Sequence, residues 1–363
     1  MNQKYKFFPN AATGFLSDED TKKYFSRLGF AVCGLILATG LSAIALSLIY
    51  TAVISAIVPV IKPINPYWAD VLLAPSTDAL ANNVISIIAS YAIALPIFLA
   101  ISKPLPKVSP FKAKMNLKNW FGGFCIAMLL FSVGGYISNV ILISIESMMN
   151  ITTSNPVGEM VEQSSIWQTI ILSVILAPIL EELLFRKIVC DRLLPLGEGY
   201  AIFVSAAIFG LIHGNFYQFA YAFLVGMFFA FIYVKTGKLI YSTVYHILLN
   251  FIGMVVSTWI VNMIDIETLN KLLESGVFDM NDPATAALME SMYILLAYEA
   301  VIMAFYVIGL VLIFKARKKN LIRLESGLLP PPKQHRFGNI FLTTGVASAI
   351  ALFVFTFVLS LIP

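Results

Sequence analysis

The 363 residues are 59% hydrophobic and only 12% charged, with a formal net charge of +4. This balance excludes a soluble globular domain and indicates a polytopic membrane protein. The three cysteines, Cys33, Cys125 and Cys190, have no CxxC or zinc-type spacing, so we expect neither a disulfide framework nor a thiolate metal site. The basic residues lie beside apolar segments, and we expect no nucleic-acid partner.

Long apolar runs predict an all-α transmembrane bundle of about nine spans. Basic residues flank one set of span ends and acidic residues the other, which predicts a cytoplasmic N-terminus. We expect an integral protein of the plasma (inner) membrane. The predicted spans cover residues 28–60, 84–101, 120–145, 166–186, 200–212, 216–234, 239–263, 292–314 and 340–362.

These spans predict a division of the chain into five regions. A cytoplasmic tail at 1–27 precedes accessory helices at 28–145, and a catalytic core follows at 160–263. An extracytoplasmic acidic loop at 264–290 leads to the C-terminal helices at 291–363.

Two carboxylates stand side by side in the fourth predicted span, after fifteen residues, 166–180, without an ionisable side chain. A charge in hydrocarbon costs at least ~2.5 kcal/mol on insertion scales, so it usually faces a bundle interior, a cavity or a partner. Glu182 and Arg186 are four residues apart and can pair on one helix face. Glu181 points about 100° away and has no such partner on its own helix, so we expect it to be available for chemistry. The plainer alternative is an interfacial cap near the headgroups.

Two further polar groups lie in the fifth and seventh predicted spans. His213 follows the fifth span in the sequence Phe209–His213, and His246 and Asn250 share one face of the seventh. Each group alone also fits a packed histidine or an interhelical hydrogen bonder. Together with the carboxylates, these groups hold nearly all the strongly polar side chains of the three spans, which indicates one shared site.

The chemistry available to such a site is hydrolysis. A carboxylate and a histidine that share a water molecule can remove its proton. A second histidine and an amide can donate hydrogen bonds to the oxyanion of a tetrahedral intermediate. Neither a GxSxG nor an HExxH motif is present, which argues against a serine hydrolase or a zincin. Zinc stays an alternative, because Glu181, His213 and His246 make a three-ligand set with an open fourth position.

The order Glu-Glu-x-x-x-Arg, Phe-x-x-x-His and His-x-x-x-Asn on successive helices resembles the CPBP family. These are CAAX-prenyl-protease-like and bacteriocin-processing intramembrane endopeptidases, formerly called the Abi family. The resemblance covers residues 167–263.

The resemblance implies roles for the motif residues. Glu181 and His213 would activate water, and His246 and Asn250 would form the oxyanion site. Glu182 and Arg186 would support them. Family members were first called metalloproteases and are now mostly described as metal-independent glutamate proteases. The resemblance thus implies no cofactor, with Zn²⁺ as the alternative, and it does not carry over a prenylated substrate.

We therefore expect an intramembrane endopeptidase that cleaves a membrane-associated peptide or protein near the cytoplasmic face of the bilayer. A non-catalytic binding protein, such as a bacteriocin immunity factor, is a second class. A transporter with Glu181, Glu182 and Glu299 as proton or ion sites is a third, although no inverted repeat supports it.

Two features of the spans leave the arrangement open. Glu299 in the eighth span is either a bundle-facing hydrogen bonder or part of the substrate path. At ~1.5 Å per residue, Glu181 lies ~8 Å from the inner end of its span, His246 ~10 Å and His213 ~20 Å. These three meet only if the span boundaries shift or the fifth span starts deeper.

Overall fold

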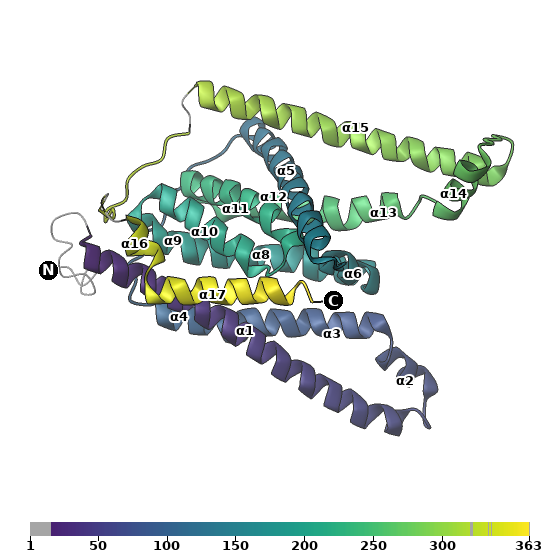
Figure 1. Ribbon diagram of the computed structural model, residues 1–363, viewed down its shortest axis with the longest axis horizontal. Coiled ribbons are helices and arrows are strands. Elements are labelled where there is room, and N and C mark those ends of the chain that lie inside the picture. The colour runs from purple at the N-terminus through teal and green to yellow at the C-terminus, as the bar shows by residue number, and fades with distance from the viewer. Residues whose placement is uncertain (1–15, 320–321, 333, 335, 363) are drawn as a thin grey trace.

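A computed structural model shows an all-α bundle in which most of the long helices run roughly along one direction (Figure 1). It describes residues 16–319, 322–332, 334 and 336–362. Within this part of the chain there is no strand, only an isolated bridge between Gly197 and Ser326. The structure confirms the predicted all-α polytopic fold class. Residues 1–15 of the predicted tail lie outside the described residues.

Seventeen α-helices and five π-helical or 3₁₀ segments, labelled η, follow one another in this part of the chain. They are α1 (Asp18–Ile61), α2 (Pro66–Leu72), α3 (Pro75–Ile87), η3 (Ile88–Ala94), α4 (Leu95–Ser102), α5 (Leu117–Met149), α6 (Pro156–Gln163), α7 (Ile166–Gln168), η4 (Thr169–Leu176), α8 (Ala177–Glu182), η5 (Leu183–Cys190), α9 (Asp191–Leu193), η6 (Leu194–Leu196), α10 (Glu198–Ile212), α11 (Phe216–Thr236), α12 (Leu239–Phe251), η7 (Ile252–Val256), α13 (Ser257–Val261), α14 (Ile266–Ser275), α15 (Pro283–Lys318), α16 (Arg336–Phe341) and α17 (Thr344–Leu359).

The described residues contain seven helical runs that are long and apolar enough to cross a membrane. They are Asp18–Ile61, Pro75–Ser102, Leu117–Met149, Ile166–Leu196, Phe216–Thr236, Leu239–Val261 and Pro283–Lys318. The fifth and ninth predicted spans correspond to the shorter apolar helices α10 and α17. The total of nine crossings and the cytoplasmic N-terminus therefore stay predictions.

Helix extends further than the apolar pattern predicts. α1 begins ten residues before the predicted span, because Ser17 caps it by accepting a hydrogen bond from the Asp20 N–H at 3.0 Å. Three acids, Asp18, Glu19 and Asp20, fill its first turn, where negative charge is favourable. α2 and α14 lie in segments without a predicted helix, and Asn65 and Asp265 cap them in the same way.

The fourth span is longer and less regular than predicted, because it continues past Arg186 to Leu196. Two π-helical segments, η4 and η5, flank the six residues of α8, which carry Glu181 and Glu182. Pro178 stands in the first turn of α8 and has no N–H to donate to the preceding turn. π-helical turns are rare and frequent at functional sites, so this irregular stretch marks the place where the site is built.

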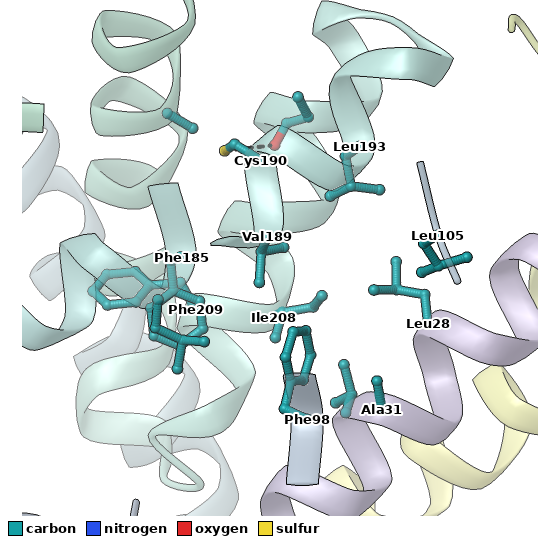
Figure 2. Packing of buried hydrophobic residues seen from close by; sticks show 14 of the residues in the cluster. Leu28, Ala31, Phe98, Leu105, Phe185, Val189, Cys190, Leu193, Ile208 and Phe209 are labelled. Carbon is teal, nitrogen blue, oxygen red and sulfur yellow. Dashed lines mark hydrogen bonds between the residues drawn. The ribbon is translucent and has the colours of Figure 1, made fainter. Parts of the chain in front are cut away.

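A buried hydrophobic cluster joins the N-terminal helices to the fourth and fifth spans (Figure 2). It contains Leu28 of α1, Phe98 of α4, Val189 of η5 and Ile208 of α10. This packing holds the segment that carries the carboxylates against the first two spans.

Glycines bring α5 close to two of its neighbours. A Cβ atom at Gly134 would come within 2.3 Å of the Tyr221 backbone on α11, and one at Gly309 of α15 within 2.4 Å of the Cys125 carbonyl oxygen. Small residues allow membrane helices to approach this closely. α5 is thus held between α11 and α15.

The two ends of the bundle differ in charge. Figure 1 places α2, α6 and α14 at one end, with Glu159 and Glu267 in the first turns of the latter two; we call it the acidic end. The start of α1, α9 and α16 lie at the other, together with the loop 103–116 and Lys187; we call it the basic end. The predicted basic flanks therefore gather on one side of the molecule.

The basic-flank rule predicts that the basic end faces the cytoplasm. Cys33, Cys125 and Cys190 are buried, so we expect these native cysteines not to react with a maleimide. Lys112 in the loop 103–116 and Glu274 on α14 are both exposed. An impermeant maleimide applied to intact cells should modify Glu274→Cys, and should modify Lys112→Cys only after permeabilisation. The reverse pattern would overturn the orientation.

Candidate active site

The Glu182 carboxylate and the Arg186 guanidinium form an ion pair in the interior of the bundle. Arg186 Nε lies 3.2 Å from Glu182 Oε2, and both side chains are fully buried. The predicted pairing of these two residues is therefore present. A buried pair is stable only when further hydrogen bonds satisfy its remaining atoms.

Two other helices complete the surroundings of Arg186. Ser205 of α10 accepts a hydrogen bond from Arg186 Nη1 at 3.2 Å and donates its own to the Phe185 carbonyl at 2.8 Å. The guanidinium lies over the rings of Phe209 and Phe229, 4.9 and 5.9 Å from their centroids. Nη2 has no hydrogen-bond partner among the described residues, so the aromatic faces supply its environment.

His246 connects the two glutamates. Its Nδ1 lies 3.3 Å from Glu182 Oε1, and its Nε2 lies 3.5 Å from Glu181 Oε2. The seventh span thus contacts both carboxylates of the fourth through one ring.

Glu181 differs from its neighbour in exposure. Its side chain is 24% exposed while that of Glu182 is fully buried. Glu181 lines a cavity of about 580 Å³, together with His213, His246 and Asn250. The structure therefore brings four of the six predicted residues to one cavity and places the other two, Glu182 and Arg186, behind it.

His213 is held in one orientation by the backbone of its own helix. Its Nδ1 lies 2.7 Å from the Phe209 carbonyl oxygen. Because a carbonyl only accepts hydrogen bonds, Nδ1 carries the hydrogen, and the lone pair of the neutral ring is on Nε2. The ring also meets Phe209 edge-on, with centroids 5.1 Å apart. His213 can therefore accept a hydrogen bond from a water molecule in the cavity.

Asn250 fills a gap left by Pro178. In η4 the Ala177 N–H donates to the Leu172 carbonyl, five residues back. The next donor in that register would be residue 178, directed at the Ser173 carbonyl, but proline has no N–H. Asn250 Nδ2 donates to the Ser173 carbonyl instead, at 3.0 Å. One amide hydrogen and the amide oxygen of Asn250 stay available to the cavity.

Sequence reasoning missed one wall of the cavity. Asn83, Ser86 and Ser90 of the second span and Asn139 of α5 line it, and within the described residues their side chains make no hydrogen bond. The spacing of 83, 86 and 90 follows one helix face, and this polar stripe in an apolar run is the signal that could have revealed the wall. The missing information was which helix packs beside Glu181.

The depth of the site also differs from the sequence prediction. Fifteen residues separate Glu181 from Leu196, about 22 Å at 1.5 Å per residue, and α10 places His213 at a similar distance from its start. The earlier mismatch arose because the fourth span was ended too early, so the ~8 Å between Glu181 and the inner end of its helix was an underestimate. Asn155, Pro156 and Val157 line the same cavity, which therefore extends toward the acidic end.

The alternative zinc ligands do not form a ligand cluster. Among the described residues no group of three His, Cys, Asp or Glu side chains is arranged to hold a metal ion. Both nitrogens of His246 face carboxylates, and Nδ1 of His213 is engaged by its own helix. Glu181, His213 and His246 as placed here do not fit a tetrahedral zinc site.

Fold and site together define a class, an α-helical integral membrane protein with an acid–base cluster facing an interior cavity. Residues 163–252 match the family of type II CAAX prenyl endopeptidase Rce1-like proteins. The matched segment contains all six predicted site residues, and the match confirms the CPBP/CAAX protease resemblance drawn from the motifs. The match covers 90 of the 363 residues, and this segment is similar in general to CAAX-protease-like membrane endopeptidases. Neither the comparison with curated proteins nor that with solved structures gives a match.

The burial of the Glu182–Arg186 pair predicts a large effect on stability. Arg186→Ala leaves a buried carboxylate without its cation, which typically costs ~3–5 kcal/mol. The double variant Glu182→Gln/Arg186→Met removes both charges and should recover much of the lost folded yield, measured by size exclusion and thermal unfolding in detergent.

A matched control is present on α14. Lys271 and Glu267 have the same i,i+4 spacing but are 69% and 78% exposed, so Lys271→Ala should change stability by less than ~1 kcal/mol. An Arg186→Ala protein as stable as the Lys271→Ala protein would contradict the structural role of the buried pair.

Proposed function

We propose that this membrane protein hydrolyses a peptide bond at mid-depth in the bundle, with water activated by Glu181 and His213 and without a catalytic metal ion. One observation carries the proposal: of two adjacent carboxylates, Glu182 is buried against Arg186 while Glu181 faces the cavity. Only Glu181 is placed to meet water and substrate.

The first step is attack by water on the scissile carbonyl carbon. His213 Nε2 accepts one hydrogen bond from the water, and the Glu181 carboxylate accepts the other and removes that proton. The new C–O bond forms as the carbonyl π electrons move onto oxygen, which becomes the oxyanion. Glu181 then holds the proton until the peptide C–N bond breaks, when it passes to the leaving amine.

The oxyanion requires hydrogen-bond donors directed at the position where its charge develops. As Glu181 gains a proton it loses the charge that faces His246, so a hydrogen on His246 Nε2 is freed for the oxyanion. The second amide hydrogen of Asn250 is the other donor. The Glu182–Arg186 pair keeps His246 in place through its contact with Nδ1.

The cavity wall supports a peptide as substrate. A peptide must unwind before it is cleaved, and its backbone groups then need partners inside the membrane. The free amide and hydroxyl groups of Asn83, Ser86, Ser90 and Asn139 offer such partners without adding charge. We propose a membrane-associated peptide or protein that enters from the acidic end, because the cavity extends in that direction.

Substitution of the water-activating residues tests the proposal. Glu181→Gln keeps the size of the side chain but cannot take the proton, so it should bind peptide and not cleave it. If Glu181 and His213 act on one water, the double variant Glu181→Gln/His213→Ala should be about as slow as either single variant. Single-turnover cleavage and peptide binding would be measured in parallel.

The matched control is Glu290→Gln, an exposed glutamate near the start of α15 that does not line the cavity, and it should cleave normally. Wild-type cleavage by Glu181→Gln would end the general-base role. Normal peptide binding without any cleavage by the unmodified protein would favour the non-catalytic binding class.

Metal removal separates the glutamate mechanism from its zinc alternative. A catalytic zinc ion would be present at about one per chain and its removal would abolish activity. We expect activity to survive prolonged dialysis against a strong chelator, with metal content followed by elemental analysis. Activity that is lost on dialysis and restored by zinc, and not by magnesium, would establish the alternative.

A further inference from the structure

Glu299 lines a second, smaller cavity between α5, α13 and α15. This cavity has a volume of about 250 Å³. α15 contributes Tyr298, Glu299 and Tyr306, and α13 contributes Ser257, whose hydroxyl lies 2.7 Å from that of Tyr298. The remaining lining is largely apolar, so one carboxylate stands among aromatic hydroxyls in an otherwise hydrophobic pocket.

The Glu299 carboxylate lacks the partner that its position requires. It lies near the middle of the 36-residue helix α15 and is exposed. Within the described residues no hydrogen bond or ion pair reaches it. Lys315, the nearest cation along its own helix, is sixteen residues away, about 24 Å. The prediction of a bundle-facing hydrogen bonder is therefore not met.

The helices that line this cavity together with α15 supply no cation either. On α5 the one basic residue, Lys118, is in the first turn at the basic end. On α12–α13 the one basic group is His246, which is engaged by Glu181 and Glu182. A carboxylate within the membrane is expensive unless it is protonated or paired. If Glu299 is paired, its cation therefore comes from another molecule.

The second cavity adjoins the active-site cavity. Phe131, Leu249 and Gly253 line both of them. Leu249 precedes Asn250 in α12, and Gly253 follows in η7, so the two cavities meet along the helix that carries the proposed oxyanion donor. A peptide bound at Glu181 and Asn250 would place a nearby side chain beside Glu299 where the two cavities meet.

We propose that the Glu299 cavity is a substrate subsite that receives a lysine or arginine side chain from the membrane-embedded peptide. The inference rests on the proposed peptidase function. A basic residue within an apolar peptide is as costly in hydrocarbon as the carboxylate, so pairing relieves both. Tyr298 and Tyr306 add hydroxyl oxygens and ring faces that suit a cation. The site selects apolar segments with a basic residue at a fixed distance from the cleaved bond.

Charge reversal tests the pairing. The protein is reconstituted in phosphatidylcholine vesicles with a leucine–alanine transmembrane peptide that carries one lysine, moved along the peptide in a series. At one position of the lysine, kcat/KM should exceed that of the same peptide with glutamine in place of lysine. The Glu299→Gln substitution should lower kcat/KM for this lysine peptide about 10- to 100-fold. Glu299→Lys should instead prefer the peptide with glutamate at that position. Glu290→Gln is the matched control and should behave as the unmodified protein.

A binding measurement keeps this test independent of catalysis. In the Glu181→Gln background, a photoreactive group beside the peptide lysine should crosslink to α15, and Glu299→Gln should reduce the yield about tenfold or more. No cleavage together with Glu299-dependent crosslinking would reject the peptidase function and keep the cation site. Cleavage and crosslinking that are unchanged by the Glu299→Gln substitution would overturn the proposed subsite. Loss of a dimer in Glu299→Gln, with all peptides unaffected, would overturn it in favour of a second copy in this cavity.

Discussion

The buried Arg186 guanidinium is the charge around which the rest of the site is arranged. A full charge inside a membrane bundle is tolerated only with a carboxylate, hydrogen-bond acceptors and aromatic faces around it. Glu182, Ser205, Phe209 and Phe229 supply these from the fourth, fifth and sixth spans. The pairing also fixes the rotation of the fourth span about its axis. The adjacent glutamate is thereby turned toward the cavity.

A proline contributes to the same arrangement from within the backbone. Pro178 leaves the Ser173 carbonyl without its helical donor, and Asn250 takes that place. The fourth and seventh spans are thus joined both through His246 and the glutamates and through this amide. The second link sets the depth of α12 against α8, which determines where the histidine meets the carboxylates. Pro178 thus accounts both for the irregular backbone of the fourth span and for the bond that positions α12 beside the glutamates.

Local spacing predicted the parts of the site that depend on one helix. The i,i+4 relation of Glu182 to Arg186 and the free position of Glu181 are properties of a single helix, and both are present. The π-helical segments were not predictable from a 3.6-residue period. The continuation of the fourth span to Leu196 was also not predicted, and it changed the estimated depth of Glu181.

Contacts between distant segments were harder to foresee. Asn83, Ser86 and Ser90 have a visible helical spacing, but nothing local says that their face lies across from the carboxylates. The same holds for Phe229, whose ring over Arg186 depends on how α11 packs. The sequence was sufficient for the fold class and the motif residues, while the walls of the cavity required the assembled bundle.

The length of α1 links the cavity to the thickness of the bilayer. Residues 28–61 of this helix contain no Asp, Glu, Lys, Arg or His and extend about 51 Å, whereas the hydrocarbon core is about 30 Å thick. A helix longer than the core is accommodated by tilting, by kinking or by local thickening of the bilayer. η3 and α4 pack along α1, and η3 carries Ser90 and Tyr91 on the cavity wall. A thicker membrane would bring α1 closer to the membrane normal and move η3 with it. The length of the lipid chains would therefore change the shape of the cavity that holds the substrate.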